Sequence, residues 1–227
     1  MKTILQGLLN EPCVVEISGK KLVNGKIIDI GTDTLVLFNG NDYVYIPIVH
    51  IQNIRAVEDS SNEISYPLNS TDLTSILSLE ETDWSLRKVL TEAKGIFVEI
   101  YVTANQPLHG YITSIMNNYF VFHSPIYKTM YITLNHLKWL IPYSQDQRPY
   151  GLDMHNFPVQ PTNPKLARTF EVQIEKFLDD VVVLNIGEKN YHIGRIIEIS
   201  GPIVKIQSAR SKPLFINMHH IKTLHQV

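Results

Sequence analysis

The sequence contains one cysteine, Cys13, and no long run of apolar residues. A single cysteine cannot form a disulfide within the chain. No apolar stretch approaches the roughly 20 residues that a helix needs to cross a bilayer. The first residues also lack the apolar region of a secretory signal peptide. These features predict a cytoplasmic protein that does not enter a membrane.

Neither sign of charge predominates, because 20 lysines and arginines stand against 22 aspartates and glutamates. The chain also lacks a P-loop, a G-x-S-x-G, an H-E-x-x-H and a Cys-x-x-Cys motif. Cys13 lies in an apolar run, where a buried and unreactive thiol is expected. The adjacent carboxylates Asp179 and Asp180 are expected to be solvated. We therefore expect no enzymatic activity, no cofactor and no bound metal.

Three segments of the chain share one pattern, which indicates an internal repeat. A glycine opens the second apolar segment of each copy, at Gly25, Gly110 and Gly194, so that successive glycines lie 85 and 84 residues apart. Each copy closes with an aromatic-Ile-x-aliphatic-x-His-aliphatic signature. The signatures are Tyr45 to Ile51, Tyr131 to Leu137 and Phe215 to Ile221. Because the glycines and the signatures keep nearly the same spacing, chance agreement is a poor explanation.

The fold expected for each copy is a small, strongly bent antiparallel sheet. Apolar residues alternate with polar ones over short runs separated by turn residues, which predicts about five strands in roughly 45 residues. A glycine within a strand suits a sharp bend or a close backbone approach. So short a sheet can bury its inner face only by curling into a barrel. The prediction is a mainly β protein of three tandem five-stranded barrels.

A short helix is expected before each barrel, because apolar residues recur there at helical spacing. The stripes include Leu5 and Leu9, then Leu86 and Leu90, then Phe170 and Ile174. The expected role of these helices is to cover the open end of their own barrel, and the alternative is a partner-binding face. The predicted domains are a first barrel at 1–57, an acidic linker at 58–82, a second barrel at 83–141, a proline-rich linker at 142–164 and a third barrel at 165–227.

A helix followed by five strands, with a bend glycine in the second strand and a short turn before the fifth, resembles the Sm-like fold that includes bacterial Hfq. The glycine together with the Tyr45 to Ile51 signature resembles more specifically an uncharacterised domain family of Bacillus, some members of which are associated with the spore coat. This resemblance covers about two-thirds of the chain. It implies a cytoplasmic protein with an association with spores.

Sm-like proteins that bind RNA carry an Asp and a Met-Asn pair between strands two and three. The corresponding positions here begin at Asp33, Asn118 and Pro202, and none has Met-Asn. Sm-like domains also assemble by pairing strand four of one unit with strand five of the next. The resemblance thus implies contact edges at Tyr43 to Ile48, at Gln52 to Ala56 and at their counterparts.

Three histidines, His50, His136 and His220, occupy one equivalent position in the three signatures. Neutral imidazoles bind transition metals, so three histidines gathered around one axis would form a metal site. The alternative, which we favour, is that each ring hydrogen-bonds a backbone carbonyl at a tight turn. Duplication copies structural and functional residues equally well, so repetition alone does not separate the two.

The third copy is the most basic part of the chain, with six lysines and arginines against two glutamates from 185 to 227. Arg195, Lys205, Arg210 and Lys212 form the candidate basic surface. Aromatic residues such as Tyr119 and Phe215 could stack on bases there. The reading that we favour is that aromatic residues at alternating positions form packing pairs across neighbouring strands. The function expected is a non-enzymatic scaffold whose partner is a protein, above all itself through strand-edge pairing. The alternative is RNA or nucleotide binding through the third barrel.

Overall fold

The structure is a computed structural model, and it describes residues 2–57, 77, 84–103, 106–144, 147–151, 165–188 and 192–226. The chain forms two compact units, each considered by itself below. Unit 1 is Met1–Ile100 with Lys138–Gln147, and unit 2 is Tyr101–Leu137 with Arg148–Val227. The division falls within the second repeat. Most of the two expected linkers lies outside the described residues, so the expected domain boundaries stay predictions.

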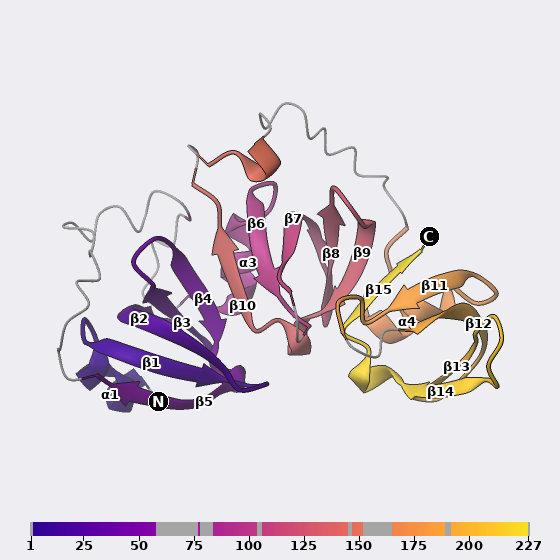
Figure 1. The fold of residues 1–227 in the computed structure, drawn as a ribbon, viewed down its shortest axis with the longest axis horizontal. Helices are drawn as coiled ribbons and strands as arrows, with labels where there is room; N and C mark the ends of the chain where they lie inside the picture. Colours follow the sequence, from indigo (N-terminus) through magenta and orange to yellow (C-terminus); the bar gives the residue numbers. More distant parts are fainter. Residues whose placement is uncertain are drawn as a thin grey trace. The chain divides into compact units, whose positions relative to one another are not determined.

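Unit 1 contains the five strands of the first repeat and two strands of the second (Figure 1). They are β1 (Pro12–Ile17), β2 (Lys21–Ile30), β3 (Thr34–Phe38), β4 (Tyr43–Pro47), β5 (Ile51–Ala56), β6 (Phe97–Tyr101) and β10 (Trp139–Pro142). The strand order of the first repeat is β4-β3-β2-β1-β5, and β10 follows on the far side of β4. The strand pairs β1–β2, β2–β3, β3–β4, β1–β5 and β4–β10 are antiparallel. The short connections between successive strands suit this arrangement.

Unit 2 contains the remaining strands of the second repeat and all strands of the third. They are β7 (Leu108–Ile115), β8 (Tyr119–Ser124), β9 (Lys128–Thr133), β11 (Val181–Leu184), β12 (His192–Ser200), β13 (Ile203–Gln207), β14 (Leu214–Asn217) and β15 (Thr223–Gln226). Their order is β14-β13-β12-β11-β15-β9-β8-β7. The third repeat therefore has the same internal strand order as the first.

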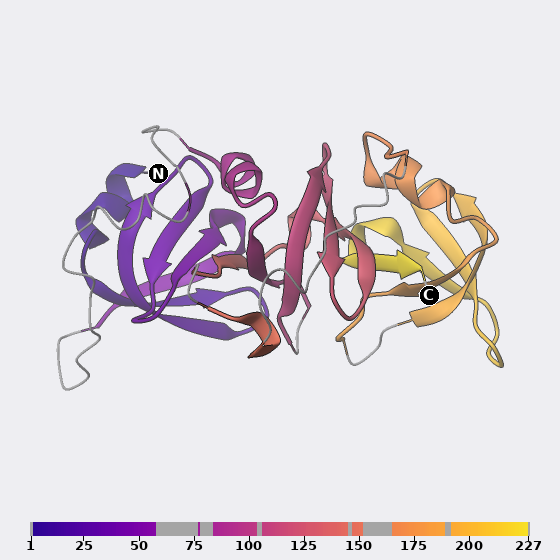
Figure 2. The same cartoon turned by 90° about the horizontal axis from the view of Figure 1, so that it is seen from above.

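The three glycines singled out by the repeat lie where two backbones approach closely. A Cβ atom at Gly25, Gly110 or Gly194 would fall against the carbonyl oxygen of the strand that follows. Three residues further on, the pairing of the second strand with the third shifts by one residue in each repeat, at Ile28, Thr113 and Ile197. Such a bulge bends and twists a strand. The bend thus results from a glycine and a bulge at matched positions, and Figure 2 shows the strongly curved strands.

Short helical segments stand before each repeat and before each fifth strand. Among the described residues, the α-helices are α1 (Lys2–Leu5), α3 (Leu86–Glu92) and α4 (Phe170–Glu175). The 3-10 segments of the same residues are η1 (Gln6–Leu8), η2 (Ile48–His50), η4 (Leu134–His136), η5 (Pro149–Gly151) and η7 (Met218–His220). The three histidines of the signatures each end one of these 3-10 turns. The expectation of short helices among many strands is therefore confirmed.

A mainly β fold is also confirmed, with five strands in each repeat. The first repeat does not close by hydrogen bonding, because no pairing among the described residues joins β4 to β5. Its inner face is nevertheless filled by buried side chains from successive strands, such as Val15, Ile27, Leu35 and Ile46. The structure thus shows a bent and open sheet where the sequence predicts a barrel.

Candidate functional site: the joints between repeats

Strand pairings and hydrogen bonds join one repeat to the next. We call such a contact a joint: strand five and the leading helix of one repeat dock on strand four and on the strand two to strand three turn of the repeat before it. One joint lies within unit 1, and the other lies within unit 2. At each joint, surfaces of two repeats bind one another.

In unit 1, β10 of the second repeat pairs with β4 of the first, with Leu140 opposite Tyr45. In unit 2, β15 of the third repeat pairs with β9 of the second, with Leu224 opposite Tyr131. Leu140 and Leu224 are 84 residues apart, as are the bend glycines of their repeats. Tyr45 and Tyr131 both open the repeated signature. The two joints therefore share one register. The expected edges of β4 and β9 pair there with β10 and β15, whereas β5 and β14 have no such pairing among the described residues.

The turn before β3 holds the approach to α3 in the first joint. Asp33 Oδ1 accepts a hydrogen bond from the backbone N–H of Leu86 at 2.6 Å. The Trp84 carbonyl accepts from the Thr32 N–H at 2.8 Å, and the Trp84 indole N–H donates to Asp29 Oδ2 at 2.9 Å. A Cβ on Gly31 would collide with Trp84. Trp84 is thus held against the first repeat by these two hydrogen bonds and by close packing on Gly31.

The second joint repeats this arrangement with a different side chain. Asn118, the counterpart of Asp33, accepts a hydrogen bond from the Phe170 N–H at 2.8 Å. Leu86 and Phe170 are each the first residue of their helix, and neither N-cap residue, Ser85 or Thr169, uses its own side chain as a cap. A side-chain oxygen from the preceding repeat satisfies a helix N–H that has no partner within the helix. Each of these helices is therefore capped by its neighbour.

Aromatic side chains fill the second joint beneath this cap. The Tyr119 hydroxyl donates to the Ala167 carbonyl at 2.7 Å, and its ring meets Phe170 edge to face at 6.0 Å. Burial raises the pKa of Tyr119 to about 12, so the hydroxyl keeps the proton that it donates. Tyr131 packs against Phe177, with ring centroids 5.2 Å apart. These side chains belong to one apolar core that spans both repeats.

Helix α4 packs against two repeats. Its residues Phe170 and Ile174 pack in one cluster with Val182 and Leu184 of their own repeat, as a cover would. The same cluster includes Tyr119 and Tyr131 of the preceding repeat. The helix therefore covers its own sheet, as expected, and also packs against the preceding repeat of the same chain.

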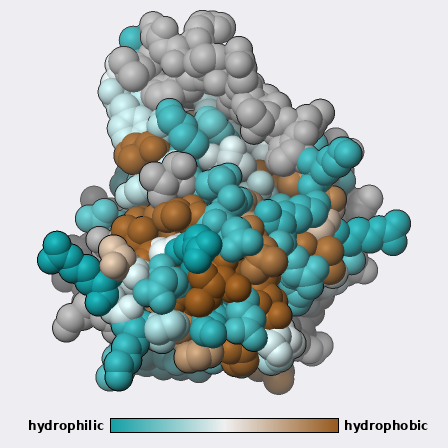
Figure 3. Space-filling view, turned by 90° about the vertical axis from the view of Figure 1, so that its right-hand side faces the viewer, coloured by the Kyte–Doolittle hydropathy of each residue, from teal (hydrophilic) through white to brown (hydrophobic). Residues whose placement is uncertain are grey.

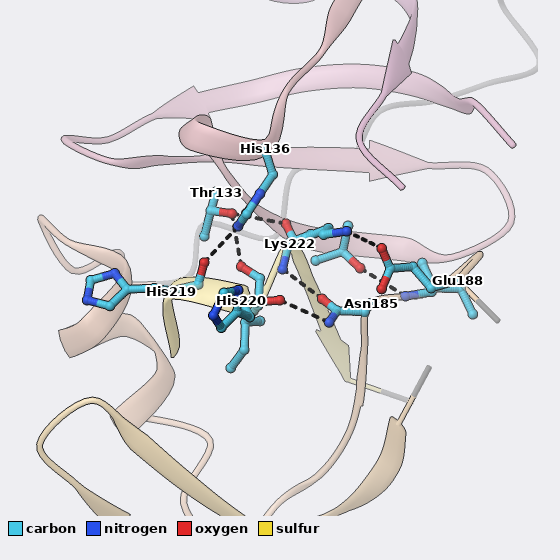
Figure 4. A network of polar contacts seen from close by, with 10 residues as sticks. Thr133, His136, Asn185, Glu188, His219, His220 and Lys222 are labelled. Atoms are coloured by element: carbon cyan, nitrogen blue, oxygen red, sulfur yellow. Dashed lines mark hydrogen bonds and ion pairs between the residues drawn. The ribbon is translucent and has the colours of Figure 1, made fainter. Parts of the chain in front are cut away.

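A polar network at the outer rim of the second joint is drawn in Figure 4. Thr133 of β9 donates through its hydroxyl to the Ile221 carbonyl at 3.0 Å, and its N–H donates to the Lys222 carbonyl at 3.1 Å. Asn185 accepts from the Lys222 N–H at 2.7 Å. Lys222 also forms an ion pair with Glu188. The polar groups at this rim are paired with one another, so the rim fixes the position of β15 beside β9.

The three equivalent histidines have different surroundings. His136 Nε2 donates to the His219 carbonyl at 2.8 Å across the second joint, and burial lowers the pKa of His136. His50 Nδ1 lies 3.1 Å from the hydroxyl of Ser18 in its own repeat. The His220 side chain is exposed, and its carbonyl accepts from Asn185. Within the described part of the chain, no three histidines, cysteines or carboxylates gather closely enough to hold a metal ion.

The candidate basic surface is partly neutralised by neighbouring carboxylates. Arg195 lies 3.3 Å from Asp179, and Lys205 lies 3.1 Å from Glu198. Arg210 and Lys212 are exposed in the segment between β13 and β14. Tyr119 is buried in the second joint, as its favoured role in packing requires, and it is therefore not available to stack on a base. Phe215 is the aromatic residue near these cations that remains exposed.

Two further findings concern membrane-spanning helices and the reactivity of Cys13. Among the residues described, no helix is long and apolar enough to span a membrane. Cys13 is buried, and burial raises the pKa of its thiol to about 11. A thiol with so high a pKa carries little of the reactive thiolate at neutral pH.

Comparison with known proteins places the chain in a family. The chain is 38% identical over 222 residues to the uncharacterised protein YwrJ of Bacillus subtilis strain 168, a match that covers 97% of this chain and 98% of YwrJ. The chain belongs to the YwrJ family. The family model for the YwrJ third domain matches residues 169–224. That match begins just before α4 and contains the third repeat's share of the second joint. The expected membership of an uncharacterised Bacillus family is confirmed.

Proposed function

We propose that this protein is a non-enzymatic scaffold of three Sm-like barrels that assembles with further copies of itself through strand edges. The observation that carries the proposal is the repeated joint. The same strands pair in the same register twice, Leu140 with Tyr45 and Leu224 with Tyr131. A repeat that can dock on a preceding repeat within one chain has the surfaces needed to dock on another chain.

The Sm-like part of the proposal draws on strand order and on the leading helices. The orders β4-β3-β2-β1-β5 and β14-β13-β12-β11-β15 place strand four at one end of a repeat and strand five at the other. This order suits association of strand four with strand five of a neighbour. The bulge at Ile28, Thr113 and Ile197 supplies the sharp bend that a small barrel needs.

An association with the spore coat belongs to the same proposal and rests on the resemblance described above. Expression of a tagged copy in Bacillus subtilis, followed by fractionation, tests it. We expect the protein in extracts of the spore coat, and recovery only from the cytosol of vegetative cells would contradict this location.

Binding of RNA or a nucleotide stays the alternative prediction. It has less support, because Arg195 and Lys205 are paired with carboxylates and Tyr119 is buried. If the alternative is right, oligonucleotide binding weakens steeply with salt and is lost on charge reversal of Lys205, Arg210 and Lys212.

Native mass spectrometry of protein purified from its own host separates the two functions. The scaffold predicts masses at multiples of the chain, without bound nucleic acid, nucleotide or metal. A single chain that carries stoichiometric RNA or nucleotide would support the alternative. A bare single chain at every concentration would contradict the scaffold.

A further inference from the structure

The third repeat presents a strand-four surface on which no other repeat is docked. At the aromatic position of the signature, Tyr45 is 1% exposed and Tyr131 is 6% exposed, because each is covered by the next repeat. Phe215, at the same position of the third repeat, is 64% exposed. Among the described residues, β14 pairs only with β13, so its outer edge is open. We call β14 with Phe215 the acceptor face.

Hydrophobic surface gathers in the space-filling view of Figure 3, which faces the side formed mainly by the third repeat. Lys205 Nζ lies 5.8 Å from the centre of the Phe215 ring, a cation–π contact. That single contact leaves most of the ring in solvent. An exposed aromatic residue on an open strand edge is a surface that proteins normally protect, unless a partner covers it.

The first repeat presents the complementary surface. At one position of the leading helix, Val89 of α3 is fully buried and Gln173 of α4 is 2% exposed. Gln173 accepts hydrogen bonds there from Tyr119 and Ala167. Ile4 of α1 occupies the equivalent position and is 83% exposed. Among the described residues, β5 pairs only with β1. We call β5 with Ile4 the donor face.

We propose that the acceptor face of one chain binds the donor face of a second copy, so that chains join head to tail in the register of the internal joints. This inference rests on the proposed function and specifies its contact surfaces. In that register Arg55, the counterpart of Leu140 and Leu224, lies opposite Phe215. Ile4 is buried on the third repeat of the neighbouring chain, in the same way as Gln173 is buried beside Tyr119 of the preceding repeat.

Two residues make the joint between chains weaker than the joints within a chain. Pro202 stands where Asp33 and Asn118 supply a capping oxygen, and proline has no side-chain acceptor. Arg55 replaces a leucine, and it brings a second cation to a ring already faced by Lys205. Association between chains is therefore reversible and depends on concentration. Because the two faces differ, the contact is heterologous, and chains can add in series until a ring closes.

Sedimentation velocity over a wide range of protein concentration tests the inference in the intact chain. Wild-type protein is expected to shift to larger species as concentration rises. Phe215→Glu, which removes the acceptor, and Ile4→Glu, which removes the donor, are each expected to stay monomeric. Both side chains are exposed, so neither change should disturb the fold, which circular dichroism can verify. Ile126→Glu is the matched control, because Ile126 is 61% exposed on the β8–β9 turn, and it should associate as wild type does.

Mixing the two monomeric variants tests the head-to-tail arrangement itself. Phe215→Glu keeps a donor face and Ile4→Glu keeps an acceptor face, so the mixture should form one-to-one dimers and nothing larger. Arg55→Leu restores the leucine of the internal joints and should lower the dissociation constant about tenfold, as burial of one aliphatic side chain allows.

Association that persists in both glutamate variants would overturn these contact surfaces while leaving the scaffold in place. A mixture that forms no dimers, although each variant alone is monomeric, would overturn the arrangement. Wild-type protein that stays monomeric at all concentrations would overturn both the inference and self-assembly.

Discussion

At the scale of single residues, the bend glycines answer a steric need. Gly25 has no positive φ, so its backbone conformation suits any residue. What excludes a larger side chain is the carbonyl of Phe38 and the side chain of Leu37, which occupy the place of a Cβ. Gly110 and Gly194 meet His123 and Gln207 in the same way. The sequence identifies these glycines by their spacing, and the structure supplies the reason for them.

Replacement of Gly25 by alanine should therefore destabilise the first repeat. A methyl group there forces two strands apart, and overpacking of this kind costs about 1–3 kcal/mol. The midpoint of urea unfolding should fall accordingly. Gly7→Ala is the control in the same repeat, since nothing lies within 4 Å of a Cβ at Gly7. Equal stability of the two variants would contradict the steric explanation.

Buried histidines should make the protein sensitive to acid. Burial lowers the pKa of His225, of His136 and of His123 below the ordinary value of 6.5. Below pH 6.5 the unfolded chain therefore binds protons that the folded chain does not, and the free energy of unfolding falls as the pH falls. His225→Phe should reduce this slope in denaturation measured across the acid range. A slope that is the same in His225→Phe as in wild type would contradict this explanation.

At the scale of elements, the helices are held by side chains from another repeat. Replacement of Asn118 by alanine removes the acceptor for the Phe170 N–H and the amide that donates to Glu171. Loss of a helix cap typically costs about 1 kcal/mol. The expected result is a lower unfolding midpoint and faster amide exchange in α4. Asn41→Ala, at an exposed turn, is the control, and an effect as large as that of Asn118→Ala would argue against the cap.

The sequence predicts most elements but not what they pack against. Alternating residues and repeated spacing are sufficient to place five strands in each repeat. The stripe that includes Phe170 and Ile174 shows which face of α4 is buried, but helical spacing carries no information about the neighbour that buries it. In the comparison with Sm-like proteins, Asp33 and Asn118 are notable only because the Met-Asn pair of the RNA-binding members is missing there. The signal for their role is present, because both offer a side-chain oxygen eight residues after the bend glycine.

The candidate site is predictable in outline for a related reason. The resemblance to Sm-like proteins implies the pairing of strand four with strand five, and the structure shows that pairing twice within the chain. The register cannot be read from the pattern, since a shift by two residues would keep the same side chains facing inward. The contacts of Trp84 and Tyr119 also depend on positions brought together over about 50 residues of sequence.

At the scale of the whole molecule, the described residues contain two joints and leave β14 of the third repeat and β5 of the first without a second strand partner. The near-neutral charge of −2 conceals a basic third repeat, and one of its cations, Lys205, lies beside Phe215 of the acceptor face. Salt screens the repulsion between Arg55 and Lys205, so added salt should slightly strengthen association between chains. Binding to nucleic acid would instead be weakened by salt.

Amide hydrogen exchange by mass spectrometry tests the central claim most directly. Peptides that contain β4 and β9 should be protected at every protein concentration, because β10 and β15 cover them within the chain. Peptides from Leu214 to Asn217 should exchange quickly in dilute protein and slowly in concentrated protein, as β5 of a second chain covers that edge. Exchange of β14 at one rate in both samples would contradict the account.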